Sequence, residues 1–205
     1  MTTMTERTAP TTGERVAGVA VVAGPVLFLA STLLYLFLEN GINNGVLGGT
    51  VGMWSCFAMA IAVPGMLRVL EPVAPRAAPR VAAVAAIGFV AGATFNIQAM
   101  YEAGTGVVLL DRLGDGVSPV ALLAFLPWGW FAPLSLALTG WLLVRAGIRL
   151  PGVLLVACGV LFVAGRPTTI GPLVLASDLL MVAALAPLGI ALTRGRFPSA
   201  DRTRR

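Results

Sequence analysis

The sequence predicts an all-α fold: a polytopic membrane protein that forms a bundle of six transmembrane helices, with N- and C-termini in the cytoplasm. Hydrophobic residues make up 58% of the 205 positions and charged residues 11%, whereas about a quarter of the residues of a soluble domain are charged. Six apolar stretches approach or exceed the roughly 20 residues that cross a hydrocarbon core. Arginines are concentrated in the tails and in every second connection between these stretches, as a fixed membrane topology requires.

The expected spans follow one another with short connections. They cover residues 16–38, 47–70, 81–101, 120–144, 150–165 and 170–193. The first is a retained anchor and not a cleaved signal peptide, because its apolar run exceeds the usual run of roughly 7 to 15 residues. We therefore expect a six-helix transmembrane domain over residues 16–193, between a disordered cytoplasmic tail (residues 1–15) and a basic cytoplasmic tail (residues 194–205).

Arginine placement sets the expected orientation. All 14 basic residues are arginine, and only Arg112 and Arg166 lie on one side of the expected bundle, against twelve on the other. Because positive residues stay on the cytoplasmic side, we expect a multi-pass protein of the cytoplasmic membrane with both termini inside. This arrangement also accounts for the net charge of +5 without nucleic acid as a partner, since the chain has no basic helix face or nucleic-acid-binding motif.

The composition excludes several kinds of chemistry. The chain has no histidine and no lysine, which removes imidazole bases, haem ligation by histidine and Schiff-base catalysis. Two cysteines cannot form a metal cluster, so we expect no metal and no cofactor. Cys56 and Cys158 lie within expected spans, where we expect reduced thiols that pack like apolar side chains. A disulfide between them is the alternative.

Asp178 is the only formal charge well inside an expected span. It lies eight residues from Ile170, or about 12 Å deep at 1.5 Å per residue. A carboxyl group at that depth needs a donor, a wet cavity or a bound proton. Asp178 is therefore a candidate catalytic acid, and the alternative is a structural aspartate that ties helices together.

Polar and aromatic residues of other spans reach a similar depth, in the external half of the bundle. The candidate ligand-binding residues are Trp54, Thr94, Asn96, Gln98, Tyr101, Trp128 and Trp130. Thr94, Gln98 and Tyr101 share one helix face, whereas Asn96 lies on another, so only one of these faces needs to line a pocket. This layer predicts a pocket open toward the outside. The alternative is interfacial tryptophan with ordinary interhelical hydrogen bonds. Glu39 and Glu102 lie at the external ends of two spans. We expect their carboxylates to be solvated, and the alternative is that one of them folds over the mouth of the pocket.

Small residues predict close helix packing. Gly48 and Gly52, like Gly88 and Gly92, have the small-x-x-x-small spacing that lets helices approach closely in lipid. We expect packing within the chain, with a homodimer as the alternative.

A faint internal repeat accompanies these glycines. Residues 15–20, 80–85 and 149–153 begin three spans similarly, and two spans end with matching spacings of glycine, leucine and arginine at residues 140–145 and 189–194. Three hairpins descended from one pair would explain the pattern. Chance matches in a chain rich in alanine, valine, leucine and glycine are the alternative.

The chain resembles two groups of membrane protein. In composition, over its full length, it resembles the uncharacterised six-helix integral membrane proteins of high-GC actinobacteria, which implies no activity. Asn96, Ile97 and Glu102 also resemble the asparagine, aromatic and glutamate pattern of small membrane-bound terpene cyclases. Here the glutamate follows Tyr101 instead of tryptophan and lies farther from the asparagine. That resemblance implies a compact helical protein with membrane carboxylates as acids.

Three functions remain open, and the sequence does not decide whether the protein is an enzyme. The first is an integral membrane protein that binds a lipophilic small molecule in the polar and aromatic pocket, with membrane lipids as its other partners. The second is a metal-independent, acid-catalysed terpene (isoprenoid) cyclase, in which Asp178 donates the proton and aromatic faces stabilise a carbocation. The third is a proton- or ion-coupled transporter that uses Asp178.

Overall fold

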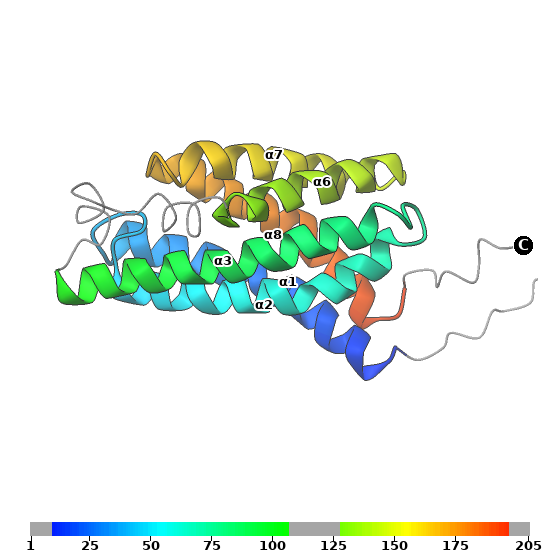
Figure 1. Ribbon diagram of the computed structural model, residues 1–205, viewed down its shortest axis with the longest axis horizontal. Coiled ribbons are helices and arrows are strands. Elements are labelled where there is room, and N and C mark those ends of the chain that lie inside the picture. The colour runs from blue at the N-terminus through cyan, green and yellow to red at the C-terminus, as the bar shows by residue number, and fades with distance from the viewer. Residues whose placement is uncertain (1–9, 107–127, 197–205) are drawn as a thin grey trace, which may run out of the picture.

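The computed structural model describes residues 10–106 and 128–196. Within these ranges all regular structure is helical. The helices are α1 (Thr12–Phe37), α2 (Val46–Leu70), α3 (Ala78–Thr105), α6 (Phe131–Arg145), α7 (Arg149–Gly165) and α8 (Gly171–Thr193). They run roughly along one long axis (Figure 1). The all-α prediction is confirmed for the part of the chain that the structure describes.

Four of these helices, α1, α2, α3 and α8, are long and apolar enough to cross a membrane. The other two are shorter, with 15 residues in α6 and 17 in α7. The expected fourth span, 120–144, coincides with α6 from Phe131 onward, and its residues 120–127 lie outside the described ranges. Residues 107–119, which precede that span, and residues 197–205 of the basic tail also lie outside them.

The first helix begins four residues before the expected span, so residues 12–15 of the expected disordered tail are helical. Thr11 and Glu14 form a capping box: the Thr11 side chain accepts a hydrogen bond from the Glu14 backbone N–H at 3.3 Å, and the Glu14 carboxylate accepts one from the Thr11 backbone N–H at 2.7 Å. Because such a pair satisfies donors that the first turn leaves free, the helix begins in polar sequence ahead of the apolar run.

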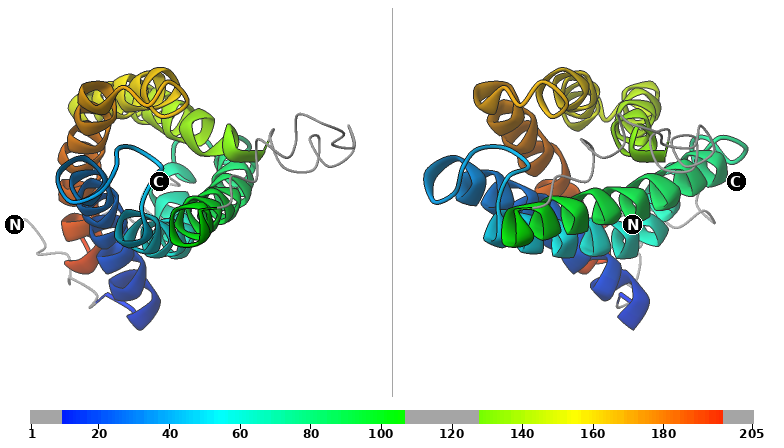
Figure 2. Two further views of the ribbon diagram at one scale, coloured as in Figure 1. Left: turned by 90° about the vertical axis from the view of Figure 1, so that its left-hand side faces the viewer. Right: turned by 60° about the vertical axis from the view of Figure 1, so that its left-hand side comes forward.

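The helices form a closed ring in the order α1, α2, α3, α6, α7, α8. Each packs on its neighbour in this order and α8 packs back on α1, which Figure 2 shows in its left view. One end of the ring, the terminal end, holds both termini of the helical region and the α2–α3 and α6–α7 connections. The α1–α2 and α7–α8 connections lie at the opposite end. Of the nine arginines in the described ranges, eight belong to the terminal end, and the exception is Arg166.

Two helix crossings in the terminal half depend on glycine. A Cβ added at Gly152 of α7 would lie 2.6 Å from the carbonyl oxygen of Gly140 in α6, and one added at Gly189 of α8 would lie 2.6 Å from the carbonyl oxygen of Gly18 in α1. Real side chains do not approach a backbone oxygen so closely, so these helices pack backbone to backbone. The two crossings pair the repeated segments of the sequence with one another.

The glycines with small-x-x-x-small spacing are also used within the chain. A Cβ at Gly48 would overlap the ring of Tyr35, and one at Gly88 would lie 2.2 Å from the backbone nitrogen of Ala132. They therefore serve the α1–α2 and α3–α6 contacts, which agrees with the prediction of packing within the chain.

The outer surface of the ring is apolar on every helix. Exposed large side chains, one from each helix, are Val19, Ile61, Val90, Leu134, Val160 and Leu179. A water-soluble monomer seldom exposes such an extended apolar surface, whereas lipid tails accept it. Together with the four long apolar helices, this surface indicates a membrane protein.

Candidate functional site

A buried polar cluster joins α1, α8 and the α7–α8 connection in the opposite half of the ring. Asp178 is fully buried and lies two turns into α8. Its Oδ2 accepts hydrogen bonds from Thr32 Oγ1 at 2.5 Å and from Arg166 Nη2 at 3.1 Å. The same nitrogen lies 3.4 Å from Asp178 Oδ1 and 3.2 Å from Thr32 Oγ1. The carboxylate and the guanidinium form a direct, buried ion pair. The Thr32 hydroxyl lies beside it and forms hydrogen bonds with both groups.

Local backbone structure brings Arg166 back toward Asp178. Arg166 is the residue at which α7 ends, and the backbone N–H of Ile170 bonds to the carbonyl oxygen of Gly165 at 3.1 Å. Thr169 has φ 55°, the left-handed conformation that closes this tight turn. In addition, Asn43 Nδ2 donates to the Arg166 carbonyl oxygen at 3.4 Å. The turn therefore places the side chain that ends one helix beside a carboxylate two turns into the next.

The Arg166 guanidinium is enclosed by aromatic rings. Its Cζ lies 5.1 Å from the ring centroid of Phe28 and 5.0 Å from that of Phe162, within the range of cation–π attraction. Arg166 is 9% exposed, and its Nε is buried without a hydrogen-bond partner. All of its side-chain hydrogen bonds to described residues come from Nη2. The ion pair thus uses Nη2 alone, and Nε and Nη1 donate to no described residue.

A cavity of about 530 Å³ lies inside the ring beside Arg166. Five aromatic side chains contribute to its wall: Phe28, Phe89, Phe95, Trp130 and Phe162. Polar side chains among its described lining are Asn43, Asn96, Gln98, Glu102, Arg166 and Thr169. The wall is therefore mainly apolar, with polar groups at a few fixed places.

Three of the predicted ligand-binding residues meet at this cavity: Asn96, Gln98 and Trp130. Asn96 Nδ2 donates to the Gly92 carbonyl oxygen at 2.9 Å, and Gln98 Nε2 donates to Glu102 Oε1 at 2.8 Å. The prediction that only one face of this helix needs to line a pocket is too narrow, since residues from both predicted faces line it.

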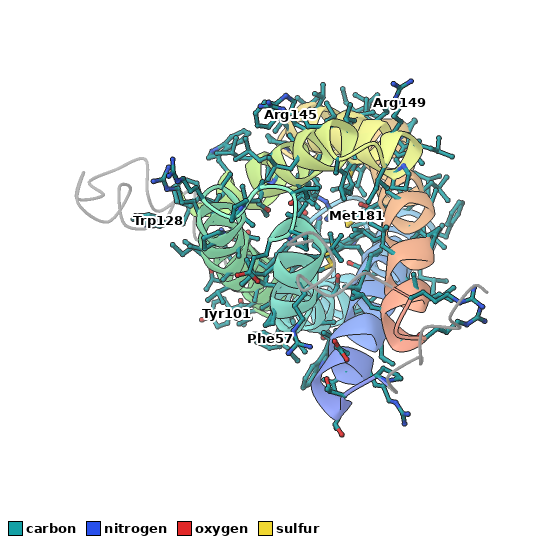
Figure 3. The ribbon with its side chains drawn as sticks, turned by 90° about the vertical axis from the view of Figure 1, so that its right-hand side faces the viewer. Phe57, Tyr101, Trp128, Arg145, Arg149 and Met181 are labelled. Carbon is teal, nitrogen blue, oxygen red and sulfur yellow. The ribbon has the colours of Figure 1, made fainter. Side chains whose placement is uncertain are left out.

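The other predicted residues lie elsewhere. Trp54 is 57% exposed and Tyr101 49% exposed, and Thr94 is exposed with its hydroxyl bonded to the Ala91 carbonyl oxygen at 2.6 Å. Figure 3 shows Tyr101 and Trp128 on the outside of the ring, away from the interior position of Met181. These side chains face the surroundings, as expected for aromatic residues at a membrane interface. Asp178 is also absent from the described lining of the cavity.

Several polar residues of the expected layer tie helices together. Ser31 Oγ donates to the Gly48 carbonyl oxygen at 2.7 Å, and Ser55 Oγ donates to the Gly24 carbonyl oxygen at 2.8 Å, which fastens α1 to α2. Cys56 and Cys158 are buried free thiols. The alternative of ordinary interhelical hydrogen bonds therefore accounts for part of the layer.

Sequence reasoning placed Arg166 in an external loop and missed its role. A signal was present, because Arg166 is one of two arginines on the side that membrane proteins keep poor in positive charge. It also lies twelve residues before Asp178, and the connection between two consecutive spans separates the two residues. A positive residue in an unfavoured place, near the only carboxylate inside a span, is typical of an ion pair.

No group of three or more side chains suited to metal binding occurs within the described ranges. Comparisons of the chain with protein-family models, with curated proteins and with solved structures find no match. Functional inference therefore depends on the cavity and the buried cluster.

Proposed function

We propose that this protein crosses the cytoplasmic membrane with six helices, its terminal end in the cytoplasm, and binds a lipophilic small molecule in the cavity of the opposite, external half. The distribution of arginines between the two ends supports the orientation. The short helices α6 and α7 complete the ring as further spans, since a helix can extend into the interface or meet locally thinned lipid.

The cavity is the observation on which the binding function depends. Its volume of about 530 Å³ falls within the roughly 300–1,000 Å³ of small-molecule pockets. Its wall combines aromatic rings with a few polar side chains, the combination that accepts an apolar body and orients it by a few hydrogen bonds. A lipophilic ligand can reach such a site from the surrounding membrane.

The geometry gives less support to an acid-catalysed cyclase. Both hydrogen-bonding neighbours of the Asp178 carboxylate, Thr32 and Arg166, act as donors to it, and Asp178 does not belong to the described lining of the cavity in which a substrate would lie. Of the four aromatic residues expected to stabilise a carbocation, Trp130 lines the cavity, whereas Trp54, Tyr101 and Trp128 are exposed. Transport that uses Asp178 also lacks a relay, because no second titratable acid touches its carboxylate within the described residues.

A binding experiment with a matched pair of variants tests the function. N-phenyl-1-naphthylamine, an uncharged lipophilic fluorophore, is titrated into protein in lipid nanodiscs, with empty nanodiscs as the blank. We expect saturable binding by the wild type and loss of it in Ala99→Trp, which fills the cavity wall on α3. Ala83→Trp, on the exposed surface of the same helix, should bind as the wild type does. Non-saturable partition alone, or normal binding by Ala99→Trp, would contradict the proposal.

Thiol labelling tests the orientation. The two ends of α7 offer exposed positions at Arg149 and Thr168, and both natural cysteines are buried. A membrane-impermeant maleimide applied to intact cells should label Thr168→Cys and leave Arg149→Cys unlabelled until the membrane is opened. The reverse result would invert the proposed topology.

A further inference from the structure

Arg166 offers hydrogen-bond donors at the wall of the cavity that the fold does not use. We infer that the ligand is an uncharged lipophile with a ring-bound carbonyl, of the quinone or cyclic-ketone class, and that its oxygen accepts a hydrogen bond from Arg166. This inference rests on the proposed binding function and adds the chemical class of the ligand.

The first step is the incomplete hydrogen bonding of the guanidinium. Arg166 lines the cavity and is 9% exposed. Asp178 and Thr32 engage only Nη2, and Nε is buried with no partner. A guanidinium has five N–H donors and no acceptor, and a buried donor without a partner is unfavourable. Nη1 also makes no hydrogen bond to a described residue, so an acceptor oxygen in the cavity can pair with a donor that the fold leaves unused.

The second step is the charge balance of the site. Asp178 already neutralises Arg166 through the ion pair at 3.1 Å. The other charged side chain in the described lining is Glu102, an acid that accepts a hydrogen bond from Gln98. A carboxylate or phosphate on the ligand would bring a further negative charge into a mainly apolar cavity, where the one cation of the described lining is already paired, and this is unfavourable. A carbonyl oxygen accepts the same hydrogen bond without adding charge.

The third step is the shape of the surroundings. Phe28 and Phe162 flank the guanidinium with ring centroids 6.2 Å apart and planes at 81°, and Phe89 and Phe95 belong to the same wall. Aromatic rings in such edge and offset arrangements pack well against a flat conjugated ring. A planar ring with a carbonyl at its rim therefore suits both the aromatic wall and the free donors.

The experiment uses three probes of nearly one shape. Calorimetric titration of protein in nanodiscs, with empty nanodiscs as blank, compares duroquinone, the hydrocarbon durene and the anion 2,3,5,6-tetramethylbenzoate. The ring of duroquinone is fully substituted, so the Cys56 thiol in the cavity wall finds no open ring position to add to. We expect duroquinone to bind at least about tenfold tighter than durene, the effect of a hydrogen bond to a charged donor, and the benzoate to bind no tighter than durene.

A pair of conservative variants assigns the effect to Arg166. Arg166→Lys keeps a positive charge for Asp178 but lacks the planar fork, so duroquinone should lose about tenfold in affinity while durene is unchanged. Arg149→Lys, at the exposed other end of α7, should leave both affinities unchanged.

The wild-type series alone decides the inference if Arg166→Lys fails to fold. Equal affinity for duroquinone and durene would overturn it, and tighter binding of the benzoate would overturn it in favour of an anionic ligand. If neither these probes nor the lipophilic fluorophore bind saturably, the proposed function itself fails, which separates the two hypotheses.

Discussion

The two halves of the ring share one composition but are built differently. In the opposite half, aromatic and polar side chains line a cavity of about 530 Å³, whereas a void of about 30 Å³ lies in the terminal half. That small void is lined by apolar side chains apart from Ser135 and Thr139 and has room for about two waters. We call the terminal half, with its small void, the closed half, and the opposite half, with its large cavity, the hollow half.

The difference lies in where the large aromatic residues are placed. Glycines bring helix backbones into direct contact in both halves, at the α6–α7 and α1–α8 crossings of the terminal half and at Gly49 and Gly165 of the opposite half. In the opposite half, the rings of Phe28, Phe89, Phe95 and Phe162 point into the ring of helices and line the cavity. A close-packed half holds the framework together, so the other half can retain a cavity and a buried charge pair.

The largest effect should come from breaking the charge pair in the hollow half. Asp178→Asn leaves the Arg166 guanidinium buried without its counter-ion, which should lower the free energy of unfolding by about 3–5 kcal/mol. Arg166→Met should lower the free energy of unfolding by less, because the carboxyl group that it leaves behind can be neutralised by a proton, whereas a guanidinium stays charged. Denaturation of the detergent-solubilised variants in SDS measures both.

The double variant Asp178→Asn with Arg166→Met is the control. It removes both charges, so it should be more stable than Asp178→Asn alone. A double variant whose loss equals the sum of the two single losses would show that the pair is not coupled.

The next largest effect should appear when the same substitution, alanine to leucine, is made in each half. Ala62 lines the small void and Ala99 lines the large cavity, and both are buried. Ala62→Leu should overpack the closed half and lower the free energy of unfolding by about 2–3 kcal/mol. Ala99→Leu should change it by less than about 1 kcal/mol, because its side chain has room. The same denaturation assay measures both, and equal losses would mean that the two halves are packed alike.

A smaller effect tests the backbone contact at the α6–α7 crossing. Gly152→Ala brings a methyl group to 2.6 Å from the Gly140 carbonyl oxygen, so the helices must separate. We expect a loss of about 1–2 kcal/mol in the free energy of unfolding. Gly13→Ala, where nothing lies within 4 Å, should be neutral or stabilising because alanine favours a helix. A neutral Gly152→Ala would show that this crossing is loose.

The sequence predicts the framework well, because the signals for it are local. A run of apolar residues between arginines marks a helix, and the helices that the structure describes begin and end within a few residues of five of the six expected ranges. The same signals predicted that small-x-x-x-small glycines would pack within the chain. The helix order around the ring could not be predicted, since lipid-facing and core-facing surfaces are both apolar.

The site was harder to predict for the same reason. In a soluble helix, polarity separates the inward face from the outward one, but here Thr94 and Tyr101 face outward while Asn96 and Gln98 reach the cavity. Asp178 was identified because a charge in a span is rare. Its partner Arg166 lies across a turn, and only the folded α7–α8 connection brings the two together.

The smallest expected effect concerns the rim of the hollow half. Glu39 Oε1 accepts a hydrogen bond from the backbone N–H of Leu47 at 2.7 Å, and Oε2 accepts one from Gly48 at 2.8 Å. The carboxylate therefore caps the N-terminus of α2, where free N–H groups and the helix dipole favour a negative charge. It is neither merely solvated nor closed over the pocket, the two roles expected from sequence.

Glu39→Ala should lower the free energy of unfolding by about 1 kcal/mol and weaken ligand binding, because Ile42 and Asn43 of the capped connection line the cavity. Glu71→Ala, at the exposed C-terminal end of the same helix, removes an unfavourable charge from the negative end of the dipole, so it should be neutral or slightly stabilising and leave binding unchanged. Denaturation and fluorophore titration of both variants separate these outcomes. If Glu39→Ala lowers stability without any effect on binding, the cap supports the helix alone and the rim of the cavity is held by the remaining contacts of the α1–α2 connection.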